Sequence, residues 1–228
     1  MRRVARLLAA LSVALPLLLV AAPAEAALPM IHRVRGIEDA HQVITVTNRS
    51  WSSTYATLQA WERRGDGTWR SVYGPWTARV GRNGFGQPKY EGDGQTPVGT
   101  YLMTGLFGTR ALSYTRFRYT VVGRDDVWVD DSGSAYYNTH QRLPADGRWR
   151  SAESLYQPVP YAHAAIVGYN PHRWAGRGSA IFLHVTTGSA TAGCVSLPAS
   201  QVVPLLRWLN PSKRPRIIMG PEAAVTYR

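Results

Sequence analysis

The chain has 228 residues, of which 26 are Lys or Arg and 14 are Asp or Glu, so its formal net charge is +12 at pH 7. Its hydrophobic content of 45% and its many glycines, prolines and aromatic residues are typical of a loop-rich β protein and exclude a disordered chain. The basic residues are dispersed, which argues against nucleic-acid binding but would concentrate the protein on a polyanionic matrix.

The first 26 residues predict a signal peptide. Three arginines precede an apolar stretch at residues 7–22, and Ala-Glu-Ala at residues 24–26 fits the small-x-small cleavage pattern. The apolar stretch is shorter than the ~20 residues that span a bilayer. We therefore expect an exported protein that starts near Ala27 and keeps no integral membrane segment; an uncleaved anchor is the alternative.

The next part of the chain is expected to be β-rich after a short N-terminal arm at residues 27–41. Residues 42–48 are rich in β-branched side chains, which favours a strand. Residues 54–64 and 70–81 flank an Asp-Gly turn, which predicts a hairpin. A glycine-rich loop then leads into a strand predicted at residues 96–103.

The following segment is less regular. Strands are predicted at residues 116–122 and 126–130, and residues 131–160 form a long irregular stretch rich in Trp, Tyr and turn residues. Stretches of this kind in a compact domain are usually lids or binding loops, although core packing of the aromatic residues is the favoured alternative. Three further apolar segments predict buried strands: residues 161–170, 179–185 and 214–220.

A helix is predicted at residues 199–209 from the spacing of its apolar side chains. Pro198 suits the first turn of that helix, whereas Pro204 falls inside it and predicts a kink or a break. The elements together predict one mostly-β domain at residues 42–228, with a short helix late in the chain.

Residues 183–198, LHVTTGSATAGCVSLP, hold the only cysteine of the chain, Cys194, ten residues after His184. A thiolate is a strong nucleophile, and a neighbouring imidazole can take the thiol proton. Gly193 and Cys194 are expected in a tight turn whose backbone N–H groups can form an oxyanion hole. The alternative is a small buried cysteine without chemistry, and we expect a catalytic thiol to differ from it by a depressed pKa.

Other chemistry is disfavoured by residue counts and spacing. A single cysteine excludes a Cys-x-x-Cys redox pair, and six scattered histidines offer no paired ligand spacing for zinc. Glu91 and Asp93 lie in a glycine-rich turn, where carboxylates usually bond backbone N–H groups, so we interpret both as structural.

The segment IFLHVTTGSATAGCVSLP resembles the catalytic motif of the L,D-transpeptidase family, also called the YkuD or ErfK/YbiS/YcfS/YnhG family. His184 matches the strand-borne histidine, and Thr191, Gly193 and Cys194 match the Ser/Thr-x-Gly-Cys part of the motif. Upstream, KYEGDGQTPVGTY at residues 89–101 resembles a second family segment. The combination, in this order, is specific, and the resemblance covers roughly residues 74–220.

Two positions depart from the common motif. Ala192 stands where the motif has a histidine, and Ser196 stands where an arginine is frequent. The chain therefore resembles a divergent branch of the family with a Thr-Ala-Gly-Cys motif.

The resemblance implies a YkuD-like β-sandwich that acts on peptidoglycan stem peptides outside the cytoplasmic membrane. Cys194 would attack the carbonyl between the third, diamino residue and the fourth, D-Ala, and a second stem peptide would complete a 3→3 cross-link. His184 would act as general base and acid, and Gly193 would contribute to the oxyanion hole.

Three further residues are candidates for substrate binding. Thr191 is expected to shape the turn or to form a hydrogen bond nearby, and Tyr169 and Asn170 are placed to reach the cleft from a neighbouring strand. An ordinary strand end followed by the Asn170-Pro171 turn is the alternative for the last two. The resemblance implies no metal or cofactor, and we expect a monomer, secreted and associated with the cell wall. Two alternatives stay open: hydrolysis of stem peptides by an L,D-carboxypeptidase, and a wall-binding protein that has lost its chemistry.

Overall fold

The computed structural model describes residues 29–227, so the predicted signal peptide lies outside the described residues. The main sheet contains β1 (Gln42–Asn48), β2 (Tyr55–Arg63), β3 (Trp69–Arg79), β6 (Gly99–Gly108), β7 (Tyr119–Val121), β11 (Ala164–Val167), β12 (Phe182–Val185), β13 (Val195–Leu197) and β14 (Arg216–Pro221). The other elements are β4 (Phe85–Gly86), β5 (Thr96–Pro97), β8 (Asp126–Val129), β9 (His140–Arg142), β10 (Ala152–Ser154), helices α1 (Ala199–Trp208) and α2 (Glu222–Val225), and the 3-10 turns η1 (Met30–Arg33), η2 (Pro160–Ala162) and η3 (Pro211–Lys213).

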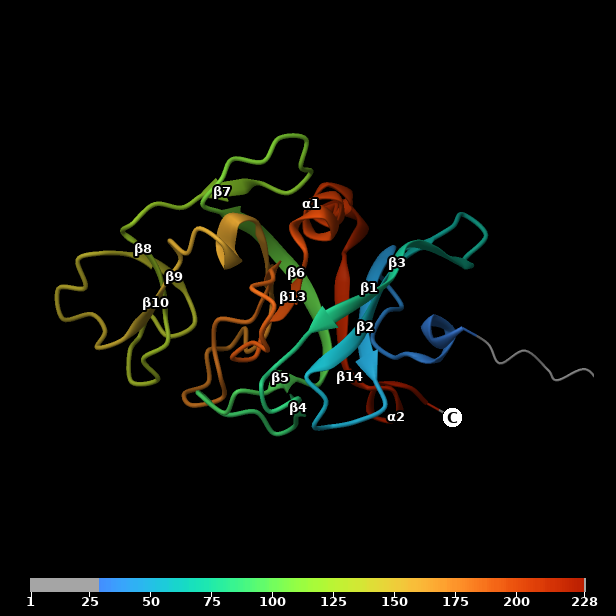
Figure 1. The fold of residues 1–228 in the computed structure, drawn as a ribbon, viewed down its shortest axis with the longest axis horizontal. Coiled ribbons are helices and arrows are strands. Elements are labelled where there is room, and N and C mark those ends of the chain that lie inside the picture. The colour runs from blue at the N-terminus through green and yellow to red at the C-terminus, as the bar shows by residue number, and fades with distance from the viewer. Residues whose placement is uncertain (1–28, 228) are drawn as a thin grey trace, which may run out of the picture.

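The main sheet closes on itself. Its strand order is β11-β12-β13-β3-β2-β1-β14-β6-β7, and β11 also pairs with β6 (Figure 1). This additional pairing joins the first strand to the eighth, so eight strands form a ring and β7 lies outside it. The apolar side chains enclosed by the ring and by α1 form the largest core cluster of the described residues. The expectation of a mostly-β, sandwich-like domain is confirmed.

The N-terminal arm packs on the outer side of β1. Ile31, Val34 and Ile37 are buried, and they form a cluster with Val43 and Trp61. Because β1 lies between β2 and β14 and has apolar neighbours on both faces, six of its seven residues are buried. The arm is thus part of the same packed body as the strands that follow it.

Helix α1 follows the cysteine, as predicted, and packs Val202, Leu205 and Leu206 into the core. The helix runs from Ala199 to Trp208 without a break at Pro204, so the possible interruption does not occur. Within residues 29–227, no helix is both long enough and apolar enough to cross a membrane.

The stretch expected to be irregular contains two short strands. β9 and β10 pair with β8 in a separate three-stranded sheet of order β10-β8-β9, at the left of Figure 1. This small sheet packs its own apolar residues, including Val129 and Trp149, into a separate cluster. It also contacts the main sheet through the indole of Trp128, which lies edge-on to Phe182 with ring centroids 5.1 Å apart. The small sheet therefore forms one side of the region around β12.

Candidate active site

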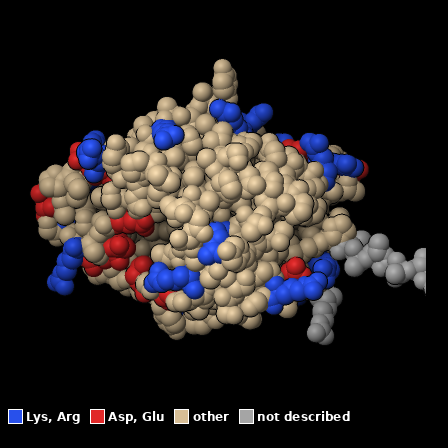
Figure 2. Space-filling view, viewed as in Figure 1, with Lys and Arg blue, Asp and Glu red and all other residues tan. Residues whose placement is uncertain are grey.

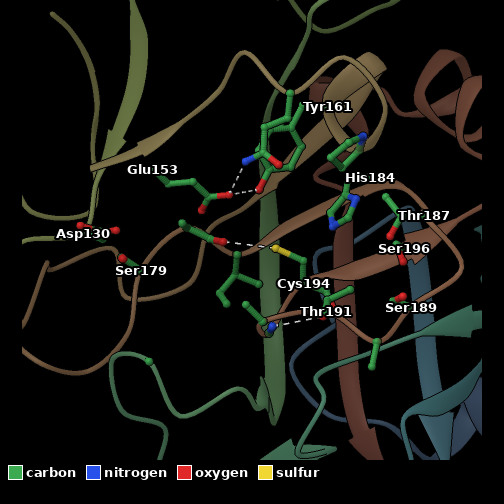
Figure 3. Close-up of a pocket in the computed structure, with 18 of the residues that line it drawn as sticks. Asp130, Glu153, Tyr161, Ser179, His184, Thr187, Ser189, Thr191, Cys194 and Ser196 are labelled. Atoms are coloured by element: carbon green, nitrogen blue, oxygen red, sulfur yellow. Dashed lines mark hydrogen bonds between the residues drawn. The ribbon is translucent and has the colours of Figure 1, made fainter. Parts of the chain in front are cut away.

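The pairing of β12 with β13 brings His184 and Cys194 into one pocket. The two strands are parallel, with Leu183 opposite Val195 and His184 opposite Ser196, and Cys194 directly precedes β13. The pocket has a volume of about 380 Å³, and both His184 and Cys194 line it (Figure 3). Two residues separated by ten positions thus meet because their strands are neighbours in the ring.

His184 is held in one orientation by the backbone. Its Nδ1 lies 2.8 Å from the carbonyl oxygen of Val185, and because a carbonyl can only accept a hydrogen bond, Nδ1 carries the proton. The Tyr161 ring packs perpendicular to the imidazole at 5.4 Å. Burial lowers the pKa of His184 to about 4. At neutral pH the imidazole is therefore uncharged, and its Nε2 is free to accept a proton.

The Cys194 thiol is buried and bonded to the main chain. Its Sγ donates to the Ala180 carbonyl at 3.3 Å and accepts from the Phe182 N–H at 3.3 Å. Burial raises the pKa of the thiol to about 12, and the charge of Glu153 adds to the increase. The expectation of a depressed thiol pKa is wrong, because desolvation outweighs the Phe182 hydrogen bond.

Thr191 fixes the turn that carries the cysteine. Its Oγ1 accepts from the Gly193 N–H at 3.1 Å and donates to the Cys194 carbonyl at 2.6 Å. Thr96, from the second motif segment, also donates to the Cys194 carbonyl, at 3.3 Å, and accepts from the Gly81 N–H. The two motif segments are therefore joined at this carbonyl. Of the two N–H groups expected to form the oxyanion hole, that of Gly193 is thus engaged by Thr191.

Gly193→Ala is expected to destabilise the turn that carries Cys194. Gly193 has φ +147°, and a Cβ there would lie 2.8 Å from the Gln95 carbonyl oxygen. We expect a loss of roughly 1–3 kcal/mol in the free energy of unfolding, measured by denaturant titration, because the turn must distort. Gly188→Ala is the matched control, since Gly188 also has positive φ but nothing within 4 Å. An equal loss in the free energy of unfolding for the two substitutions would show that the close contact between residue 193 and the Gln95 carbonyl is not its cause.

Tyr169 and Asn170 do not line the pocket of Cys194. The Tyr169 hydroxyl donates to the Arg177 carbonyl. The Asn170 amide donates to the carbonyls of Trp174 and Gly178, at 3.0 and 3.1 Å, and accepts from the Trp174 N–H. Both side chains are thus engaged within the loop that precedes β12 and lie outside the pocket lining, whereas Thr191 lines the pocket.

Asn138, from the irregular stretch, positions the main chain beside the thiol. Its Oδ1 accepts from the Trp128 indole at 2.8 Å and from the Ala180 N–H at 3.2 Å. Its amide donates to the Tyr169 and Asn170 carbonyls at 2.9 and 3.1 Å. Ala180, whose carbonyl accepts from Cys194, has φ +52°, an uncommon conformation for alanine that these contacts stabilise.

Several pocket residues had no signal in the sequence. Asp130, Glu153, Tyr161 and Ser179 all line the pocket, and the Tyr161 hydroxyl donates to Glu153. They come from segments expected to be strand ends or irregular loop, and only the three-dimensional pairing of β10 with β8 brings Glu153 near the cysteine.

The lowered pKa of His184 predicts a pH dependence of stability. An unfolded histidine has a pKa near ~6.5, so between about pH 6.5 and 4 the unfolded chain binds more protons than the folded one. The free energy of unfolding should therefore fall as the pH drops through this window, by up to about 3 kcal/mol from His184 alone. Denaturant titrations at pH 7 and 4.5 would measure this change in the free energy of unfolding. His184→Gln should show a smaller change between the two pH values, and an equal change in the variant would contradict the role of His184.

Comparison with known families agrees with this geometry. A family model described as the L,D-transpeptidase catalytic domain, YkuD, matches residues 52–218, which include both His184 and Cys194. No curated protein and no solved structure shows significant similarity to the chain. Because the matched region covers most of the sequence, the chain belongs to the YkuD family of L,D-transpeptidase catalytic domains, a cysteine-dependent family that acts on peptidoglycan.

Proposed function

We propose that the protein is an exported L,D-transpeptidase that forms 3→3 cross-links between stem peptides through an acyl-enzyme on Cys194. The observation that carries the proposal is the shared pocket, in which an uncharged His184 with a free Nε2 accompanies the only thiol of the chain. This is the arrangement that a cysteine acyl transfer needs: a nucleophile, a proton acceptor and a backbone donor for the oxyanion.

The acylation step follows from the resting protonation states. Since both groups are uncharged, Sγ gives its proton to Nε2 of His184 as it bonds to the carbonyl carbon before D-Ala. The Cys194 N–H stabilises the oxyanion, and the C–N bond then breaks while the imidazolium returns the proton to the departing amine. D-Ala leaves, and a thioester remains on Cys194.

Deacylation reverses these roles. The side-chain amine of a second stem peptide attacks the thioester carbonyl and gives a proton to Nε2 of His184. The C–S bond breaks, an amide bond forms, and the imidazolium reprotonates the sulfur. Water in place of the amine would give the hydrolytic outcome of a carboxypeptidase.

Intact-protein mass spectrometry after incubation with a tetrapeptide stem ending in D-Ala tests the proposal. An adduct with the mass of the tripeptide acyl group is expected. Cross-linked product on addition of an amine-bearing stem supports transpeptidation, whereas free tripeptide alone identifies a hydrolase. A donor that is neither consumed nor attached would contradict acyl transfer and favour a wall-binding protein.

Export is the second part of the proposal, and it is supported by the pattern of residues 1–26. Protein recovered from outside the cytoplasmic membrane should begin near Ala27 when its N-terminal peptide is sequenced. Its net positive charge would favour association with an anionic wall. An intact N-terminus on the exported protein would contradict cleavage.

A further inference from the structure

The Cys194 pocket has an acidic lobe, formed by Asp130, Glu153 and Ser179, that the acyl-transfer steps do not use. Figure 3 shows these three side chains on one side of Cys194, with His184 on the other. In the space-filling view, acidic side chains gather around a hollow on the left half of the molecule (Figure 2). The pocket is therefore chemically two-sided, with the proton acceptor and the carboxylates on opposite sides of the thiol.

Two oxygens in this acidic lobe lack hydrogen-bond partners. Ser179 is only 6% exposed, and its Oγ has no partner among the described residues. Oδ1 of Asp130 is likewise buried and unpartnered. Buried polar atoms are nearly always bonded, and leaving one unbonded costs about 1–3 kcal/mol. Ser196 Oγ, on the His184 side of the same pocket, is also buried and unpartnered, but two such atoms within the acidic lobe indicate places for the donors of a ligand there.

The lobe also has an excess of negative charge. Burial raises the pKa of the Glu153 carboxyl, and the charges of Asp130 and Glu91 raise it further. Lys89 lines the same pocket, but its ammonium is ion-paired with Asp93 at 2.6 Å. Among the residues that the structure describes, Asp130 and Glu153 thus have no ion-pair partner.

The geometry distinguishes between kinds of cation. Within residues 29–227, no group of three or more His, Cys, Asp and Glu residues is arranged to hold a metal ion. A primary ammonium group has three N–H donors and no acceptor, which suits separate oxygens on Asp130, Glu153 and Ser179. The three acceptors therefore fit an organic ammonium better than a metal ion.

We propose that the acidic lobe binds the ammonium group of the diamino residue of a stem peptide, next to the thiol. The inference rests on the proposed function and deepens it, because it makes a free side-chain amine a condition for good substrates. The amine can belong to the acyl donor or to the acceptor, and these two sources have different kinetic signatures.

Binding to the Cys194→Ala variant tests the lobe without any chemistry. Calorimetry would compare a tetrapeptide stem that has a free side-chain amine with the same peptide acetylated at that amine. We expect the free amine to bind at least about tenfold more tightly, and Asp130→Asn or Ser179→Ala to remove most of this preference. Asp125→Asn is the matched control, since Asp125 is exposed and lies outside the pocket.

Acylation kinetics with Cys194 present then identify the source of the amine. If the amine belongs to the donor, Asp130→Asn should slow thioester formation with the free-amine peptide about tenfold or more and leave the acetylated peptide unaffected. If it belongs to the acceptor, thioester formation should be unchanged, and the thioester should partition towards water instead of the added amine.

The outcomes separate the inference from the proposed function. Equal binding of free and acetylated peptides, unaltered by Asp130→Asn and Ser179→Ala, would overturn the ammonium site even if the thioester forms. A preference for the free amine without any thioester on the unsubstituted protein would keep the site and overturn acyl transfer. Unfolding temperatures of the two variants would be measured in parallel, and Glu153→Gln provides a third variant if one of them misfolds.

Discussion

Cys194→Ala is expected to reduce formation of the acyl adduct to the uncatalysed background while the fold persists. Cys194 is the only thiol of the chain, so no other side chain can form the thioester. The substitution removes one sulfur atom and its hydrogen bonds to Ala180 and Phe182, which should lower the free energy of unfolding by only about 1–3 kcal/mol. Intact-protein mass and a thermal unfolding curve check the two parts.

Cys194→Ser is the matched control for the cysteine. A serine keeps a hydroxyl that can donate to the Ala180 carbonyl, so its unfolding temperature should lie closer to that of the unsubstituted protein. Its weaker nucleophile should still leave turnover far below that of the thiol. Full turnover by either variant would contradict a thioester intermediate.

His184→Gln is expected to slow acylation by about 10²–10⁴-fold, because proton transfer from the thiol loses its acceptor. The requirement is strict in this pocket, since burial holds the thiol pKa at about 12 and little free thiolate exists at neutral pH. The rate of the unsubstituted protein should rise with pH through about 4, as His184 loses its proton, and this limb should vanish in the variant. Adduct formation followed over a pH series measures both effects.

His163→Gln provides the control for this second prediction. His163 is also partly buried and bonds the Tyr119 hydroxyl at 3.0 Å, but it lies outside the Cys194 pocket. Its replacement should leave the acylation rate and the pH dependence of that rate the same as in the unsubstituted protein. A similar loss in both variants would show that histidine burial, not proton transfer, accounts for the result.

The regular strands could be predicted because their signals are local. Alternation and β-branched residues located β1, and an Asp-Gly turn located the hairpin of β2 and β3 to within a few residues. The three-residue strand β13 was missed, since such a strand has too few positions to show a period. The closure of the ring by β6 and β11 depends on pairing between distant segments, which no local pattern encodes.

The site was predictable where one short motif contains it. His184 lies on β12, and Thr191 and Cys194 lie in the connection that leads into β13, so their proximity follows largely from a single strand pairing. Tyr169 and Asn170 were expected nearby because they end a neighbouring strand. However, β11 runs antiparallel to β12 with Ala164 opposite His184, so the residues that follow β11 point along the sheet away from the histidine.

The burial of Cys194 also determines how the protein withstands oxidants. Peroxides and disulfides react with thiolates, and a thiol whose pKa burial raises to about 12 stays protonated at neutral pH. An unpaired cysteine can therefore persist in oxidising surroundings without forming a sulfenic acid or a disulfide between copies of the chain. For the exported enzyme proposed above, the low resting reactivity that makes His184 necessary would also prolong activity in such surroundings.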